Sequence, residues 1–100
     1  MSSSALKQSE KQFQGAVVEY AELNGWKTYH TFDSRRSDPG FPDLVLSRDD
    51  RLVFLELKSE TGRASTAQRD WLDALQRAPG ITVGVMRPRD WATLEEMLSR

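Results

Sequence analysis

Residues 40–58 read GFPDLVLSRDDRLVFLELK, which is two apolar runs separated by an acidic pair at positions 49 and 50. Short apolar runs on either side of a two-residue turn are typical of a β-hairpin. A hairpin that turns symmetrically about this pair places Asp43 opposite Glu56. The stretch therefore predicts that two carboxylates meet at one end of a strand pair.

The apolar residues of the two runs support this register. It pairs Val45 with Phe54 and Ser47 with Leu52. It also collects a wholly apolar set on the opposite face, namely Leu44, Leu46, Val53, Leu55 and Leu57. A shift of one residue would turn every side chain to the other face and mix this set with polar residues. The hydrophobic pattern therefore favours the register that brings the two carboxylates together.

Asp43, Glu56 and Lys58 together predict a site for phosphodiester hydrolysis. Directly opposed side chains have Cβ atoms about 4.5–5.5 Å apart, and two carboxylates so close need a cation or a shared proton. Carboxylate oxygens suit Mg²⁺ or Mn²⁺, whereas one histidine and no cysteine serve zinc poorly. Lys58 lies two residues beyond Glu56 and hence on the same face. It can position or deprotonate a metal-bound water, or stabilise the pentavalent phosphorus.

Each of these three residues also has a simpler interpretation. Asp43 fits a turn after Pro42, and Glu56 with Lys58 fits an exposed surface pair. The three together are harder to explain in this way, because charged residues are seldom set into apolar strands without a partner.

The flanking sequence predicts helices and two more strands. Apolar residues at helical spacing predict one helix over Ser9–Leu23, capped by Ser9 and Gln12, with an earlier start near Ser4 as the alternative. They predict a second helix over Ser65–Arg77. The remaining expected elements are strands at Trp26–Phe32 and Ile81–Met86 and a last helix that Asp90 caps and that reaches Ser99. The order αβββαβα predicts an α/β fold, a mixed sheet flanked by helices.

Composition limits the class of protein. One hundred residues predict one domain over 1–100, with residues 1–8 as a candidate flexible N-terminus. A net charge of −1 argues against a DNA binder that relies on bulk positive charge. The absence of cysteine excludes disulfides, thiolate zinc sites and a cysteine nucleophile. With no signal peptide and no membrane-length apolar run, we expect a cytoplasmic protein without a membrane partner.

Four segments in order resemble the VRR-NUC branch of the PD-(D/E)XK nuclease superfamily. They are GFPDL from Gly40, FLELK from Phe54, QRDWL from Gln68, and a preceding helix with Glu10. The likeness extends from Glu10 to about Met86, nearly the whole chain. It implies a restriction-endonuclease-like core, αβββαβ(α), and a Mg²⁺- or Mn²⁺-dependent endodeoxyribonuclease. No phosphate-binding Gly-rich loop appears, so no nucleotide cofactor is expected.

The resemblance also implies a set of site residues. The metal would be bound by Asp43, Glu56 and the main-chain carbonyl of Leu57, with Lys58 catalytic. Glu10 would contribute through a metal-bound water. Its spacing from Phe13 and Val17 points it to the buried face of its helix, although a first-turn glutamate also favours the helix dipole.

Gln68 has two competing interpretations. It forms a capping box with Ser65, and it also shares a helix face with Trp71, Leu72 and Leu75, which would bring its amide to the site. The resemblance favours the catalytic role. We expect the two roles to exclude one another, because one rotamer would have to serve both.

Other candidates are weaker. Four arginines lie on loops or at helix starts beside the site and are candidate phosphate contacts, with simple solvation as the alternative: Arg35, Arg36, Arg63 and Arg69. His30 reads as a core or edge residue of its strand. Trp71 and Trp91 read as core residues, since they recur with leucines at helical spacing.

The expected substrate is branched DNA. Small stand-alone members of the family resemble virus-encoded Holliday-junction resolvases that act as homodimers. Symmetric cutting of two strands needs two sites, which a two-fold dimer supplies. A phage- or bacteria-encoded resolvase acting in the host cytoplasm is therefore expected. The alternatives are a repair or replication nuclease for flaps or other branched DNA, and, in another class, a catalytically silent DNA-binding or interaction module.

Overall fold

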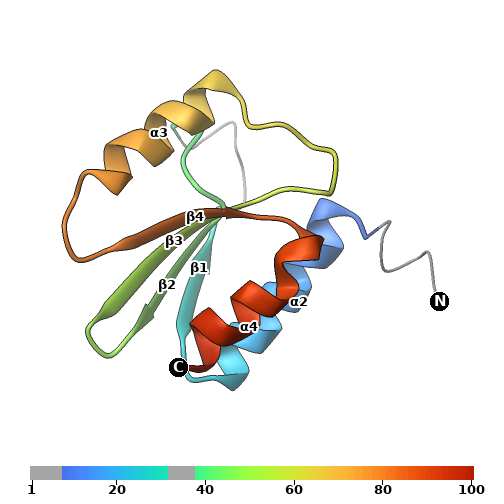
Figure 1. The fold of residues 1–100 in the computed structure, drawn as a ribbon, viewed down its shortest axis with the longest axis vertical. Coiled ribbons are helices and arrows are strands. Elements are labelled where there is room, and N and C mark those ends of the chain that lie inside the picture. Colours follow the sequence, from blue (N-terminus) through green and yellow to red (C-terminus); the bar gives the residue numbers. More distant parts are fainter. Residues whose placement is uncertain (1–7, 32–37) are drawn as a thin grey trace.

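The computed structural model describes residues 8–31 and 38–100, so most of the predicted flexible N-terminus lies outside it. The predicted order of elements is confirmed (Figure 1). Along the chain come α2 (Glu10–Leu23), β1 (Lys27–His30), β2 (Leu44–Arg48), β3 (Arg51–Leu57), α3 (Thr66–Gln76), β4 (Thr82–Met86), the 3₁₀ turn η1 (Pro88–Asp90) and α4 (Trp91–Ser99). Within these ranges, no helix has the length and apolar character that crossing a bilayer requires.

The four strands form one mixed sheet in the order β1-β2-β3-β4. Strands β1, β2 and β3 pair antiparallel, whereas β4 runs parallel to β3. The predicted hairpin register is confirmed, because Val45 pairs with Phe54 and Ser47 with Leu52. Asp49, in the turn, has a φ of 55°, a conformation that aspartate tolerates better than most residues.

Helices α2 and α4 cover one face of the sheet (Figure 1). The apolar set expected on this face is fully buried, with 0% exposure for Leu44, Leu46, Val53, Leu55 and Leu57. The helices contribute a matching set of buried residues, namely Phe13, Val17, Ala21, Leu94 and Leu98. Each such side chain stabilises the fold by about 1.5–3 kcal/mol relative to an exposed one. This core holds β2 and β3 in the register on which the site depends.

Helix α3 packs on the opposite face through aromatic contacts. The ring of Phe41 lies edge-on to Trp71, at 5.1 Å between centroids, and to Phe54, at 6.1 Å. Trp71 and Trp91 are only partly buried, so the prediction that both are core residues holds in part. Trp91 packs against the core and lies edge-on to Tyr20. Both tryptophans therefore lie at the edges of the packed layers, partly exposed to solvent.

The ends of the elements differ in detail from the prediction. The capping box of Ser9 and Gln12 is present at the start of α2. Strand β1 begins one residue later than predicted, because Trp26 enters the core and its indole N–H donates to the Leu98 carbonyl at 2.8 Å. Phe32, the predicted end of this strand, lies outside the described residues. Asp90 is the N-cap residue of α4 as predicted, but its side chain makes no capping hydrogen bond to that helix. The Asp90 carboxylate instead accepts the Arg87 N–H at 2.8 Å, which closes the preceding 3₁₀ turn.

Gly40 brings the entry of β2 against the start of α3. Its φ is 87°, and a Cβ built on it would lie only 2.3 Å from the backbone carbon of Ala67. No side chain fits in that gap. The loop that leads to Asp43 therefore rests backbone to backbone on the first turn of α3.

Candidate active site

Asp43 and Glu56 meet where β2 begins and β3 ends. The strand ladder stops at the pair Leu44–Leu55, so Asp43 stands one residue before β2 while Glu56 lies within β3. The Asp43 Oδ2 accepts the main-chain N–H of Leu57 at 2.8 Å, which fixes its carboxylate at the end of β3. The structure thus brings the two carboxylates together as the register predicted.

Lys58 lies beside the same carboxylate. Its Nζ is 3.4 Å from the Glu56 Oε2, and the two side chains are only 10% and 1% exposed. The main-chain N–H of Lys58 donates to the Met86 carbonyl at 3.0 Å, which extends the pairing with β4 beyond the last residue of β3. An ion pair this deeply buried acts on its surroundings far more strongly than one in water.

Gln68 performs both of its predicted roles at once, so the expectation that they exclude one another is wrong. Its Nε2 donates to the Glu56 Oε2 at 2.8 Å, while its Oε1 accepts the Ser65 N–H at 2.7 Å. The Gln68 N–H completes the capping box by donating to the Ser65 hydroxyl at 3.1 Å. An amide carries an acceptor and a donor that point in different directions, so one rotamer satisfies the helix end and the carboxylate together.

The Glu56 carboxyl has a strongly altered acidity. Burial, and then the neighbouring charge of Asp43, raise the pKa of Glu56 from 4.5 to about 8, and the opposing effect of Lys58 is smaller. The second oxygen, Oε1, is buried and has no hydrogen-bond partner among residues 8–31 and 38–100. The Glu56 carboxyl therefore binds a proton more readily than an ordinary glutamate does, and a cation bound there would displace that proton.

The oxygen atoms fit a hard divalent ion. The unpartnered Glu56 Oε1 and the adjacent Asp43 carboxylate are the ligand type that Mg²⁺ and Mn²⁺ prefer. Across the described ranges, no three acidic or histidine side chains gather closely enough to enclose a metal by themselves. A bound ion would therefore need main-chain or solvent oxygens as well, and the Leu57 carbonyl is the residue expected to supply one.

Glu10 lies within electrostatic reach of this centre. Partial burial, and then the charge of Asp43, raise the pKa of Glu10, while Lys58 lowers it. Glu10 is exposed, so it is not part of the buried core, although its charge interactions are with Asp43 and Lys58 of the centre. It stands in the first turn of α2 at the rim of the centre, where contact through a water is compatible with its exposure.

We expect the stability of the metal-free protein to fall as pH rises from about 5 to about 8. In that range the folded protein keeps the Glu56 proton, whereas an unfolded glutamate has released it. Each pKa unit corresponds to about 1.4 kcal/mol, so the loss is on the order of a few kcal/mol. Thermal unfolding in EDTA, followed by circular dichroism, measures it.

Glu56→Gln is the control for this prediction, because it removes the titrating group and keeps the shape. The variant should lose less stability than the wild type over the same pH range. Adding Mg²⁺ should restore the stability that the wild-type protein loses at pH 8. Parallel pH curves for the two proteins in EDTA would contradict the altered acidity of Glu56.

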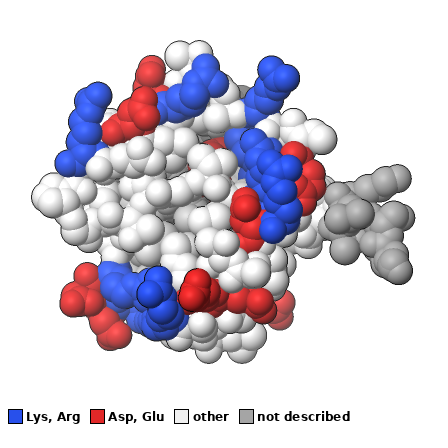
Figure 2. Space-filling model, in the orientation of Figure 1, with Lys and Arg blue, Asp and Glu red and all other residues white. Residues whose placement is uncertain are grey.

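Two of the four candidate phosphate-binding arginines, Arg63 and Arg69, lie within the described residues. Arg35 and Arg36 lie outside the described residues. Arg63 is exposed in the loop between β3 and α3, and Arg69 donates to the Ala64 carbonyl at 2.8 Å, which ties it to the start of its own helix. On the face shown in Figure 2, basic and acidic side chains intermingle around an uncharged area. DNA binding by this face would therefore depend on individual contacts and not on a continuous positively charged surface.

Arg87 is a residue that the sequence analysis missed. Its guanidinium donates to the carbonyls of Ser59 at 2.7 Å and Gly62 at 2.6 Å, which holds the loop after Lys58 in a closed turn. That loop lies close to the lysine, since a Cβ built on Gly62 would be 3.6 Å from the Lys58 Cδ. The contact joins segments 25–28 residues apart, so no local sequence signal indicates it.

Comparisons with known proteins agree with the predicted family and fold. The family model of the VRR-NUC domain matches residues 5–90. A solved VRR_NUC domain protein superimposes with a TM-score of 0.69 at 17% identity, covering 90% of this chain and 87% of its own. Hjc of Archaeoglobus fulgidus, a Holliday junction resolvase, has a TM-score of 0.56 at 19% identity, covering 78% and 68%. These likenesses confirm the restriction-endonuclease-like fold. No curated protein matches the sequence.

Proposed function

The chain belongs to the VRR-NUC domain family of the PD-(D/E)XK nuclease superfamily, and on that premise we propose that it is a metal-dependent endonuclease that resolves four-way DNA junctions. The observation that supports the proposal most directly is the environment of Glu56. This buried carboxyl adjoins Asp43, Lys58 and Gln68, and it has one oxygen left without a partner. Strongly perturbed acids of this kind are concentrated at functional sites.

The residues divide the chemistry among them. Asp43, Glu56 and the Leu57 carbonyl would hold Mg²⁺ or Mn²⁺, which when bound lowers the pKa of a water and neutralises charge on the phosphate. The Leu57 N–H fixes Asp43, and the Gln68 amide fixes Glu56. The Lys58 ammonium, held next to Glu56, orients the attacking water or stabilises the charge that develops on phosphorus. Glu10 would orient a further water at the rim.

The proposed substrate follows from symmetry. A junction is resolved by two matched cuts, and one chain of this size offers one such centre. A homodimer with a two-fold axis would present two identical centres to two strands of the same polarity. The likeness to Hjc, which is named as a Holliday junction resolvase, supports junctions over other branched DNA.

The test compares purified protein on labelled four-way junction, flap and linear duplex, each with Mg²⁺ and with EDTA. We expect paired, symmetric cuts in the junction, only with Mg²⁺, and a dimer in analytical ultracentrifugation. Faster cleavage of the flap would reassign the substrate. Binding without any cleavage, unaffected by metal, would defeat the nuclease proposal and favour a silent DNA-binding module.

A further inference from the structure

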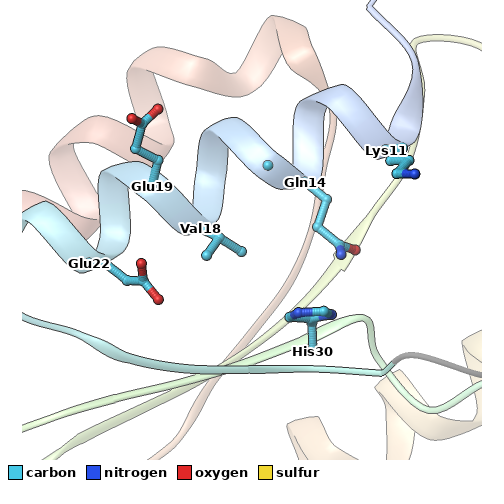
Figure 3. A pocket seen from close by; sticks show the side chains of 7 residues that line it. Lys11, Gln14, Val18, Glu19, Glu22 and His30 are labelled. Atoms are coloured by element: carbon cyan, nitrogen blue, oxygen red, sulfur yellow. The ribbon is translucent and has the colours of Figure 1, made fainter.

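A hollow of about 420 Å³ lies beside the site, between α2 and β1. Figure 3 shows side chains that line it, with His30 on the strand facing Gln14 on the helix, and Glu22 further along the helix. The His30 end adjoins the candidate active site. His30 pairs with Leu44, and the next residue, Thr31, donates its N–H to the Asp43 carbonyl at 3.1 Å.

The two ends of the hollow differ in chemistry, with hydrogen-bond donors at one end and a carboxylate at the other. Lys11 and Gln14, which can offer N–H groups to an anion, lie toward the start of α2, where Glu10 marks the active site (Figure 3). Glu22 lies toward the other end, and its Oε2 accepts the Thr28 hydroxyl at 2.9 Å, which leaves its Oε1 to accept from another group. Val18 supplies an apolar surface between these ends.

Gly15 is a second, independent observation on the same wall. It lies in the interior of α2, where alanine would be more stable by about 0.5–1 kcal/mol. Packing does not require glycine there, because a Cβ built on it would meet nothing within 4 Å. The missing side chain leaves the hollow open at its middle.

We propose that this hollow binds one unpaired nucleotide of the DNA next to the cleaved phosphodiester. A phosphate fits the donor end, with Lys11 as its charged contact and Gln14 as a hydrogen-bond partner. A base fits over the bare backbone of Gly15 and the side chain of Val18. The Glu22 carboxylate can then accept an exocyclic amino group, which adenine, cytosine and guanine have and thymine lacks.

The size and order of these groups match that ligand. The volume falls within the range of small-ligand sites, about 300–1,000 Å³. The donors lie nearest the centre, as a phosphate adjoining the cleaved one requires, and the carboxylate lies where a phosphate would be repelled. The inference rests on the proposed nuclease function, and it predicts that a four-way junction with an unpaired nucleotide at the branch is cut faster than a fully paired one.

The first experiment measures a ratio of cleavage rates. Two junctions are compared, one fully paired and one with a single unpaired adenine at the branch. Wild type should cut the second about tenfold faster, which corresponds to about 1.4 kcal/mol of added transition-state binding by the bound base. Gly15→Leu, which fills the hollow and improves the helix, should bring the ratio close to one. Ala74→Leu adds a leucine at an exposed position on α3 and should keep the wild-type ratio.

The second experiment detects the nucleotide without cleavage. The unpaired adenine is replaced by 2-aminopurine, and its fluorescence is followed in EDTA. The signal should change on adding wild type or Ala74→Leu, but not on adding Gly15→Leu. Equal signals or equal rate ratios for wild type and Gly15→Leu would overturn the inference. If wild type cuts no DNA, the nuclease proposal fails, and the fluorescence still decides whether the hollow binds a nucleotide.

Discussion

Lys58→Ala is expected to lower the rate of DNA cleavage by about 10³-fold while leaving the protein folded. The substitution removes the ammonium that lies 3.4 Å from Glu56, and hence the group proposed to orient water or stabilise the phosphorus. Single-turnover cleavage at saturating Mg²⁺ measures the effect. Asp43→Ala should abolish cleavage as well, but through loss of metal affinity, which titration with Mn²⁺ separates from the effect of the lysine.

Lys27→Ala is the matched control for this prediction, because Lys27 is an exposed lysine on β1. It should cleave at the wild-type rate. If Lys58→Ala cleaves DNA at a rate within a few fold of wild type, Lys58 has no part in the mechanism. This conclusion does not depend on the results for the other residues.

Gly40→Ala is expected to cost several kcal/mol of folding stability, a large share of the roughly 5–15 kcal/mol typical of a domain. The added methyl would meet the Ala67 backbone at 2.3 Å, at a φ of 87° that side chains disfavour. Strain and overpacking of this kind each cost about 1–3 kcal/mol. Urea unfolding followed by tryptophan fluorescence measures the loss.

Gly80→Ala separates the cost of backbone strain at positive φ from the cost of overpacking. Gly80 has a similar φ of 82°, but a Cβ built on it meets nothing within 4 Å. It should therefore lose only the strain contribution, about 1 kcal/mol. Equal losses at the two glycines would show that the close approach of the loop to α3 is not what requires Gly40.

The hairpin and its carboxylates were predictable because their signals are local. Alternation with period two, a two-residue turn and a wholly apolar face leave one register for β2 and β3, and that register brings Asp43 to Glu56. The family resemblance added Glu10 and Gln68, which spacing alone left ambiguous. Their roles in metal binding and catalysis stay predictions that the experiments above test.

The remaining features depend on geometry that spacing does not encode. The double use of Gln68 requires the orientation of its amide relative to β3, which packing of α3 sets. The Arg87 contacts join the loop after β3 to the end of β4, and Asp90 belongs to a 3₁₀ turn that the sequence pattern did not reveal. Trp26 leaves its strand because the core offers its ring a place and its N–H a partner.

The double engagement of the Gln68 amide restricts the amino acids that this position tolerates. Glutamate would keep an acceptor for the Ser65 N–H but set another negative charge against Glu56. Lysine would keep a donor and lose the acceptor, and asparagine is one methylene too short to span the same gap. None of these three replacements meets both demands, so each would loosen the helix end, the hold on the Glu56 carboxylate, or both.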